Sequence, residues 1–221
     1  MRILVVVAMM LALPIALSSR AKAAETGVEE NLLIAPEYYE VSGVAAGDML
    51  NIRAEPDAHA DIVGTLPPGA SPVEVIAVTD GPTRWGKVVA GDGVGWVSMA
   101  YLAEVDPARV PGTPIPTQTV CAGTEPFWSL TFSADSMSFE APDVAATTLS
   151  LSSSGAFVAR SHRFYAVAGD SANGMSAVVS SGEYCSDGMS DRDYGWSIDL
   201  LRSDGGKVSG YTGCCTRAID E

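Results

Sequence analysis

Short runs of apolar and β-branched residues, separated by turn signals, form the main pattern in the first half of the chain. Asp80-Gly81 and Asp92-Gly93 are hairpin signals, because glycine accepts the positive φ that a tight turn requires. No pattern of helical period is long enough to predict a helix here. Many short strands with tight turns are typical of a small β-barrel. The expected strands are residues 38–41, 49–52, 61–66, 72–79, 85–89 and 95–98.

The second half repeats this kind of pattern. Apolar and polar residues alternate from Trp196 to Leu200, as in a half-buried strand, and Asp204-Gly205-Gly206 then predicts a hairpin turn. We therefore expect an all-β protein, in which a small barrel is followed by a second antiparallel β-barrel or β-sandwich domain. The strands expected in this second domain are residues 127–132, 137–140, 147–151, 164–168, 175–179, 196–201 and 207–211.

A proline-rich stretch separates the two halves. Residues 105–118 contain four prolines, which fix φ and lack an amide donor, so this stretch is not expected inside a sheet. We predict an extended linker at 106–118, between one domain at 37–105 and another at 119–221. Residues 24–36 are acidic and weakly periodic, which leaves both a flexible arm and a short helix open.

The first 23 residues have the layout of a secretory signal peptide. A basic start at Arg2 precedes an apolar run at 3–17, and the small residues Ala21 and Ala23 form a cleavage site. The run is shorter than the roughly 20 residues that span a bilayer, and Pro14 interrupts it. We therefore expect cleavage after Ala23, export to the periplasm or the medium, and no stable membrane insertion afterwards.

The charge of the exported chain limits its partners. Removal of residues 1–23 takes away three basic and no acidic residues, which leaves a net charge of −17. A chain with this negative charge repels phosphate backbones and anionic lipid. Nucleic acid is therefore not an expected partner. A neutral glycan, a peptide or a basic protein is compatible with this charge.

Four cysteines, all in the second half, predict disulfides because the compartment is oxidising. Cys214 and Cys215 are adjacent and would point to opposite faces of a strand, so they are not expected to pair with each other. Cys185 should pair with one of them and Cys121 with the other, and both arrangements remain open. The spacing lacks the C-x-x-C pairs of zinc sites, so we expect no metal and no cofactor.

The motifs of the first half resemble those of the bacterial SH3 (SH3b) domain. They are L-N-I-R-A-E-P at 50–56, I-V-G-T-L at 62–66, Gly69, W-G-K-V at 85–88 and G-W-V-S-M-A-Y-L at 95–102. The resemblance covers about residues 38–105 and implies an SH3-like barrel. Gly86 departs from it, because the family usually has an aromatic or a leucine after this tryptophan.

Aromatic rings stack on sugars and on peptide groups, and arginine can bind a carboxylate through two hydrogen bonds. Both residue types can equally be structural, with the tryptophans filling the barrel core. The candidate ligand-binding residues are Tyr39, Arg53, Trp85, Trp96 and Tyr101.

The second half also resembles a family, one of uncharacterised bacterial envelope proteins and lipoproteins. The motifs are G-T-E-P-F-W at 123–128, C-S-D-G-M-S-D at 185–191 and G-C-C at 213–215. The resemblance implies a small β-barrel in the envelope and brings no mechanism. Its residues of unknown role are Glu125, Trp128, Asp187 and Asp191. Carboxylates near Gly188 could hold calcium, but a loop that hydrogen-bonds to itself is the expected arrangement.

No catalytic constellation is apparent in the sequence. The two histidines, His59 and His162, lie in different halves, and there is no G-x-S-x-G motif. We expect a non-catalytic envelope protein whose SH3b domain engages peptidoglycan or a protein partner. The alternative is an inhibitor or sensor of a secreted hydrolase such as lysozyme, since a basic enzyme would suit the acidic chain. A hydrolase with its own targeting domain is the third hypothesis.

Overall fold

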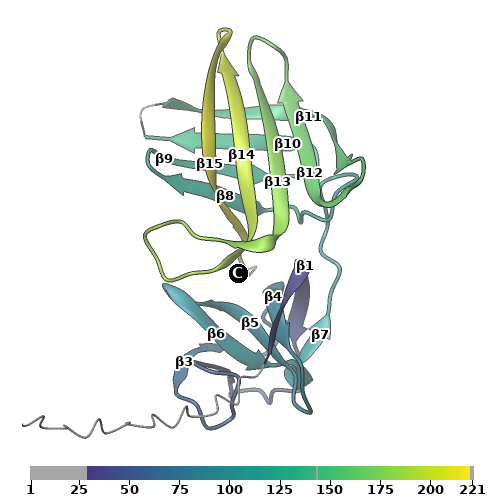
Figure 1. Ribbon diagram of the computed structural model, residues 1–221, viewed down its shortest axis with the longest axis vertical. Helices are drawn as coiled ribbons and strands as arrows, with labels where there is room; N and C mark the ends of the chain where they lie inside the picture. The colour runs from purple at the N-terminus through teal and green to yellow at the C-terminus, as the bar shows by residue number, and fades with distance from the viewer. Residues whose placement is uncertain (1–28, 143, 220–221) are drawn as a thin grey trace, which may run out of the picture.

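The structure, a computed structural model, describes residues 29–142 and 144–219, and it is all-β as expected. Figure 1 shows two β structures with the linker at one side. Residues 30–104, whose motifs resemble the SH3b domain, lie below and are called the SH3 half, and the barrel lies above. The predicted signal peptide lies outside the described residues. No helix within these ranges has the length and apolar character needed to cross a bilayer.

The SH3 half is a seven-stranded antiparallel sheet with the strand order β3-β2-β6-β5-β4-β1-β7. Its buried core holds Val75 and Val97, and both faces of β4 are buried because the barrel also covers Glu74 and Ile76 on the outer face. A short 3-10 helix, Met99–Tyr101, precedes the last strand. The strands are β1 (Glu30–Val41), β2 (Leu50–Arg53), β3 (Ile62–Leu66), β4 (Val73–Thr79), β5 (Trp85–Ala90), β6 (Gly93–Ser98) and β7 (Leu102–Glu104).

The first strand begins earlier than the sequence indicated. Residues 30–36 were expected in an acidic arm or a short helix, and they form the first part of β1. Leu32 pairs with Ala77 of β4, and the register shifts before Glu37 pairs with Val75. The strand holds in spite of its polar and proline residues because β4 pairs with it on both sides of the irregular stretch, at Glu30–Leu32 and at Glu37–Tyr39.

The second half is a closed antiparallel barrel with the strand order β10-β11-β12-β13-β14-β15-β8-β9. Its interior is filled by large side chains, including Trp196, Phe132, Phe139 and Met137. This decides between the barrel and the sandwich left open by the sequence. The strands are β8 (Thr119–Thr124), β9 (Phe127–Phe132), β10 (Ser136–Ala141), β11 (Val144–Phe157), β12 (Arg160–Gly169), β13 (Gly174–Cys185), β14 (Tyr194–Asp204) and β15 (Lys207–Arg217).

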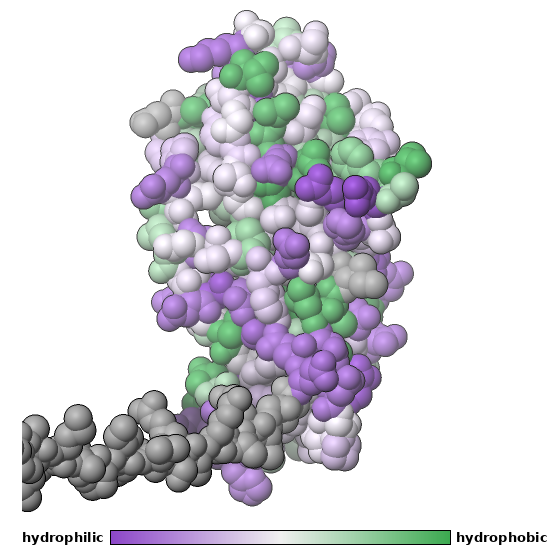
Figure 2. Space-filling model, viewed as in Figure 1, coloured by the Kyte–Doolittle hydropathy of each residue, from purple (hydrophilic) through white to green (hydrophobic). Residues whose placement is uncertain are grey.

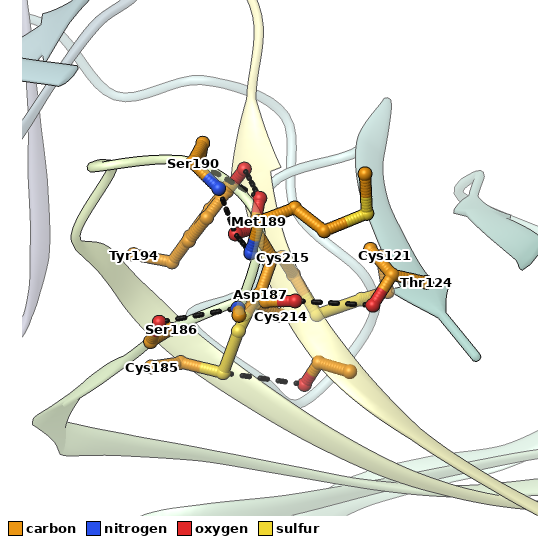
Figure 3. Close-up of a disulfide and its surroundings, with 12 residues drawn as sticks. Cys121, Thr124, Cys185, Ser186, Asp187, Met189, Ser190, Tyr194, Cys214 and Cys215 are labelled. Carbon is orange, nitrogen blue, oxygen red and sulfur yellow. Dashed lines mark hydrogen bonds between the residues drawn. A yellow bond between two sulfur atoms is a disulfide. The ribbon is translucent and has the colours of Figure 1, made fainter. Parts of the chain in front are cut away.

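Two disulfides close the barrel, and the prediction that Cys214 and Cys215 take different partners is confirmed. Cys121 and Cys215 are directly paired on β8 and β15, and their disulfide lies inside the barrel. Cys214 faces the other way and bonds Cys185, at the end of β13 (Figure 3). The second bridge therefore ties the loop after β13 to the outside of β15.

The proline-rich linker is folded onto the barrel. Val110 and Ile115 are fully buried in the barrel core, and the backbone turns between them with Val110 N donating to Ile115 O at 2.8 Å. A β-bridge joins Arg109 to Pro116. The expectation of an extended linker is therefore wrong, because two apolar side chains in this stretch find a place in the core.

The two halves meet through a buried chain of hydrogen bonds. Trp196 Nε1 in the barrel donates to Tyr38 Oη of β1 at 3.1 Å, and Tyr38 Oη donates to Glu74 Oε1 of β4 at 3.0 Å. Thr216 Oγ1 of β15 donates to Glu74 Oε2 at 2.6 Å. Gly195 leaves space for Pro36, because an added Cβ would lie 2.4 Å from the proline ring.

The loop after β13 makes a second, more exposed contact with the SH3 half. Lys87 Nζ of β5 lies 2.8 Å from Asp193 Oδ2 and 4.4 Å from the centre of the Tyr184 ring. Arg192 Nε donates to Gly91 O at 2.7 Å, at the β5–β6 turn. The barrel therefore rests on the SH3 half through both a buried and a peripheral set of polar contacts.

Candidate functional site

A groove of about 540 Å³ in the SH3 half brings together three of the five predicted ligand-binding residues. Arg53, Trp85 and Tyr101 line it, and they come from β2, β5 and the 3-10 helix. The other lining residues are Gly43, Val44, Ala45, Asp48, Met49, Leu50, Asn51, Ala58, Thr83 and Ser98. The groove is thus partly apolar and is bordered by short loops.

The aromatic residues of the groove differ in exposure. Tyr101 is 44% exposed, and its carbonyl accepts the amide of Ser42, which fixes the short helix to the chain after β1. Trp85 is mostly buried, and its amide donates to Thr79 Oγ1 at 3.0 Å. Tyr101 therefore offers more ring surface to a ligand than the buried Trp85 does.

Arg53 is held by the protein itself. Its Nη1 donates to Ala60 O at 2.7 Å, within the loop that follows β2. This bond engages one of the five N–H donors of the guanidinium, and the others remain for a ligand carboxylate. The carboxylate of Asp48, which accepts the amide of Met49 at 2.8 Å, is the acidic group of the groove.

Alternation along β2 explains how the groove is built. Leu50 and Ile52 point into the core, so Asn51 and Arg53 line the opposite side, together with Met49, which is 40% exposed. Sequence reasoning missed Asp48 and Met49. The alternation along β2 could have indicated Met49. It precedes Leu50, the first side chain of the strand that points into the core, so Met49 is expected to point outward.

Tyr39 and Trp96 lie away from the groove. Tyr39 is buried, and burial and the hydrogen bond to Glu37 Oε2 raise the pKa of its phenol. Trp96 is the ladder partner of Arg53 and of Lys87, and Lys87 Nζ lies 5.7 Å from its ring centre. Both rings contribute to packing in this structure.

Gly86, the departure from the SH3b pattern, has a steric reason. An added Cβ would lie 2.7 Å from Met99 Sδ and 3.1 Å from Val75 Cγ1. The space that a side chain at this position would take is therefore filled by Met99 and Val75.

The barrel motifs are largely engaged in holding their own loops. Asp187 Oδ1 accepts the amides of Ser190 and Met189, and these bonds hold the pKa of its carboxyl well below the usual range. Asp187 Oδ2 accepts the hydroxyls of Ser190 and Tyr194 (Figure 3). This is the self-bonded loop expected from the sequence. Within the described ranges, no three His, Cys, Asp or Glu side chains lie close enough to hold a metal ion together.

The remaining motif residues separate into buried and exposed groups. Trp128 is buried at the edge of the barrel core, where its ring centre is 5.5 Å from that of Tyr211. Glu125 is exposed in the turn between β8 and β9. Asp191 donates its backbone amide to Asp92 O at 2.9 Å, across the two halves.

Glu74 is a buried carboxyl that sequence reasoning did not single out. Burial raises its pKa to about 7, although hydrogen bonds from Thr216 and Tyr38 oppose the shift. It lies between the two halves and does not open into the groove. Its place indicates a structural role.

Comparison with known families identifies the first half. Residues 48–103 match the bacterial SH3 domain family. No curated protein sequence is significantly similar to the chain, and no solved structure matches it. Residues 48–103 are therefore a bacterial SH3 domain, joined to a disulfide-bonded barrel whose bonds suit an oxidising location outside the cytoplasm.

Proposed function

We propose that this chain is an exported, non-catalytic envelope protein of the periplasm or the medium, and that its SH3b domain binds peptidoglycan. Bacterial SH3 domains commonly bind cell-wall peptidoglycan, which supports this class of ligand. The observation that carries the proposal is the groove where Tyr101, Met49 and Asp48 are available to a ligand.

The chemistry of the groove favours the peptide part of the wall polymer. Tyr101 and Met49 offer exposed apolar surface to an aliphatic or peptide group. Asp48 offers a negative charge, and Arg53 offers a positive charge and the N–H donors that do not bond Ala60 O. A stem peptide that carries both an ammonium group and a carboxylate fits this arrangement.

The non-catalytic part of the proposal draws on the position of the reactive groups. His59 is exposed and lies 3.2 Å from Asp57. His162 is on β12 of the barrel, far along the chain and in the other half. Asp170, beside Ser171, accepts the amides of Ala172 and Asn173 in a turn. None of these arrangements pairs a nucleophile with a base.

Sedimentation of the mature, oxidised protein with purified peptidoglycan tests the proposal. Tyr101→Ala should weaken binding about tenfold or more, because an exposed aromatic anchor is lost. Asp48→Asn should weaken it roughly two- to fivefold, the range of an exposed charge contact. Acetylation of the free amines of the peptidoglycan should remove the effect of Asp48→Asn.

Two substitutions serve as matched controls. Ile62 is an exposed apolar residue of β3 and Glu40 an exposed carboxylate of β1, and neither lines the groove. Ile62→Ala and Glu40→Gln should bind as the unsubstituted protein does. If the unsubstituted protein stays in the supernatant, or if the controls lose binding equally, the wall-binding proposal fails.

A second candidate function is inhibition or sensing of a secreted hydrolase such as lysozyme. One observation favours it: residues 110–159, which supply β8 to β11, contain four acidic residues and no basic one. A surface of this charge attracts a basic enzyme. Assay of lysozyme activity at low salt, with and without the protein, tests this role.

A further inference from the structure

The turn between β8 and β9 presents an exposed aromatic side chain beside a shallow groove. Phe127 is 58% exposed, although the next residue, Trp128, is buried in the barrel. The groove measures about 530 Å³ and is bordered by acidic Glu140. Its lining residues are Ala122, Gly123, Thr124, Phe127, Trp128, Ser129, Glu140, Ala141 and Pro142.

The groove is held in shape by the barrel. The rings of Trp128 and Phe139 stack, with 6.1 Å between their centres. Gly123 makes room for the indole, because an added Cβ would lie 2.2 Å from Trp128 Nε1. Thr124 pairs with Phe127 across a two-residue turn. This pairing fixes the backbone that carries the exposed Phe127 ring. A partner would therefore meet a preformed surface.

A second exposed apolar residue lies on the neighbouring loop. Thr124 Oγ1 donates to Asp187 O at 3.1 Å, which joins the tip of the β8–β9 hairpin to the loop after Cys185. Met189 of this loop is 69% exposed, and Figure 3 shows its side chain on the side of Thr124. We call Phe127, Met189 and the groove beside Glu140 the hairpin surface.

The charge around the hairpin surface has one sign. The turn between β8 and β9 contributes Glu125 and the end of β10 contributes Glu140, while residues 119–141 contain no lysine, arginine or histidine. The nearest arginine of the adjoining loop, Arg192, is turned toward the SH3 half, where it bonds Gly91 O. Apolar side chains are scattered over the face of the barrel seen in Figure 2, and no broad apolar band covers it. The recognition feature is therefore the small apolar surface of Phe127 and Met189, bordered by acidic side chains.

We propose that the hairpin surface docks a loop of a basic protein. The loop would place an aliphatic or aromatic side chain against Phe127 and Met189, and a lysine or arginine beside Glu140. A second copy of this chain is a poor occupant, because it would bring the same acidic side chains to the contact. The inference gives the second candidate function its site, and it does not depend on wall binding by the SH3b domain.

The test measures binding of the full mature protein to three basic probes, lysozyme, cytochrome c and ribonuclease, at low salt. At least one probe should bind, and Phe127→Ala should weaken that binding about tenfold, as expected for a central aromatic contact. Glu140→Lys should weaken it by a similar factor, because a like charge then faces the partner. Sedimentation of both variants with peptidoglycan should be unchanged, which separates this site from the SH3b groove.

Matched variants away from the hairpin surface exclude a general effect of charge or hydrophobicity. Val208 is 61% exposed and lies near the β14–β15 turn, at the end of β15 away from the strand pairs with β8. Asp135 is an exposed carboxylate in the turn between β9 and β10, at the end of β9 away from Phe127. Val208→Ala and Asp135→Lys should change affinity less than about twofold, since surface substitutions outside the contact have small effects. Equal losses in Asp135→Lys and Glu140→Lys overturn the proposal, and so does a dissociation constant weaker than about 1 mM for all three probes.

Discussion

The SH3 half and the barrel are both antiparallel β structures, but they place their aromatic residues differently. The barrel is closed and its interior is filled by Trp196, Phe132 and Phe139. The SH3 half leaves Tyr101 beside a groove. A filled barrel can recognise a partner only at its rim and outer face, whereas an SH3 sheet can do so between its loops. The candidate sites of the two halves differ for this reason.

Covalent stabilisation is the sharpest difference between the halves, so its removal has the largest expected effect. The Cys121–Cys215 bridge spans 94 residues and the Cys185–Cys214 bridge spans 29. Replacing the first pair by alanines should lower the free energy of unfolding by about 4 to 5 kcal/mol, and replacing the second by about 3 to 4 kcal/mol, on the chain-entropy account. Urea unfolding of each double variant measures this difference. Equal losses would show that loop length does not set the contribution of each bridge.

Glu74, in the buried contact between the two halves, gives the second largest expected effect on stability, and this effect depends on pH. The pKa of Glu74 is raised to about 7, above its ordinary value of 4.5, so the folded protein binds the proton more tightly than the unfolded chain does. The resulting stabilisation is complete below pH 4.5 and is lost as the pH rises through 7.

Between pH 5 and 8 the expected loss from Glu74 is about 2 to 3 kcal/mol in the free energy of unfolding. Glu74→Gln should remove most of this dependence. The lowered pKa of Asp187 acts in the opposite direction, because its contribution is lost as the pH falls below 3.8. Thermal unfolding between pH 5 and 8 therefore isolates Glu74. If Glu74→Gln had the same dependence of stability on pH as the unsubstituted protein, Glu74 would be excluded as the cause of that dependence.

Packing inside the SH3 half provides a smaller test. Gly86→Ala places a methyl group against Met99 and Val75, and it should cost about 1 to 3 kcal/mol of stability through overpacking. In a Met99→Ala background Gly86→Ala should cost less, since the nearest atom is the Met99 sulfur. Met99→Ala alone is the reference, because Met99 packs against the core and its loss has a cost of its own. Denaturation curves of both single variants and the double variant provide the measurement. An undiminished cost of Gly86→Ala in the Met99→Ala background would argue against the steric explanation.

The groove gives the smallest expected change in stability. Tyr101 is partly exposed and makes no side-chain hydrogen bond among the interactions described, so Tyr101→Ala should change the free energy of unfolding by less than about 0.5 kcal/mol. Its loss of wall binding would then be a loss of contact and not of folding. A large drop in melting temperature for this variant would instead assign Tyr101 to the core of the SH3 half.

Much of the SH3 half followed from the sequence because local motifs determine it. The tryptophans and glycines of the SH3b motifs have a characteristic spacing along the sequence. Gly95 shows why a glycine is required at one of these positions. An added Cβ there would lie 2.5 Å from Ile52 and 2.9 Å from Arg53 O. The alternation along β2 places Met49 on the outer side, but that Asp48 and Met49 border a groove depends on how β2 and the 3-10 helix meet in space.

The barrel was predicted less completely, since distant residues decide several of its features. Strand β8 was not expected, because its small and polar residues give a weak strand signal, and pairing with β9 and β15 fixes it. The contact between Trp196 and Tyr38 joins residues 158 positions apart, and the contact between Thr216 and Glu74 joins residues 142 apart. No local pattern in the sequence can indicate such pairs.

The hydrogen bond from Trp196 to Tyr38 also bears on how this protein could evolve. Trp196 belongs to the barrel core, yet the acceptor of its indole N–H belongs to the SH3 half. A recombination that moved the barrel to another chain would leave a buried donor unpaired, at a cost of about 1 to 3 kcal/mol. Glu74 would lose Thr216 in the same event. The two halves are therefore expected to be inherited as a pair, with exchange possible only when the new neighbour supplies a matching acceptor.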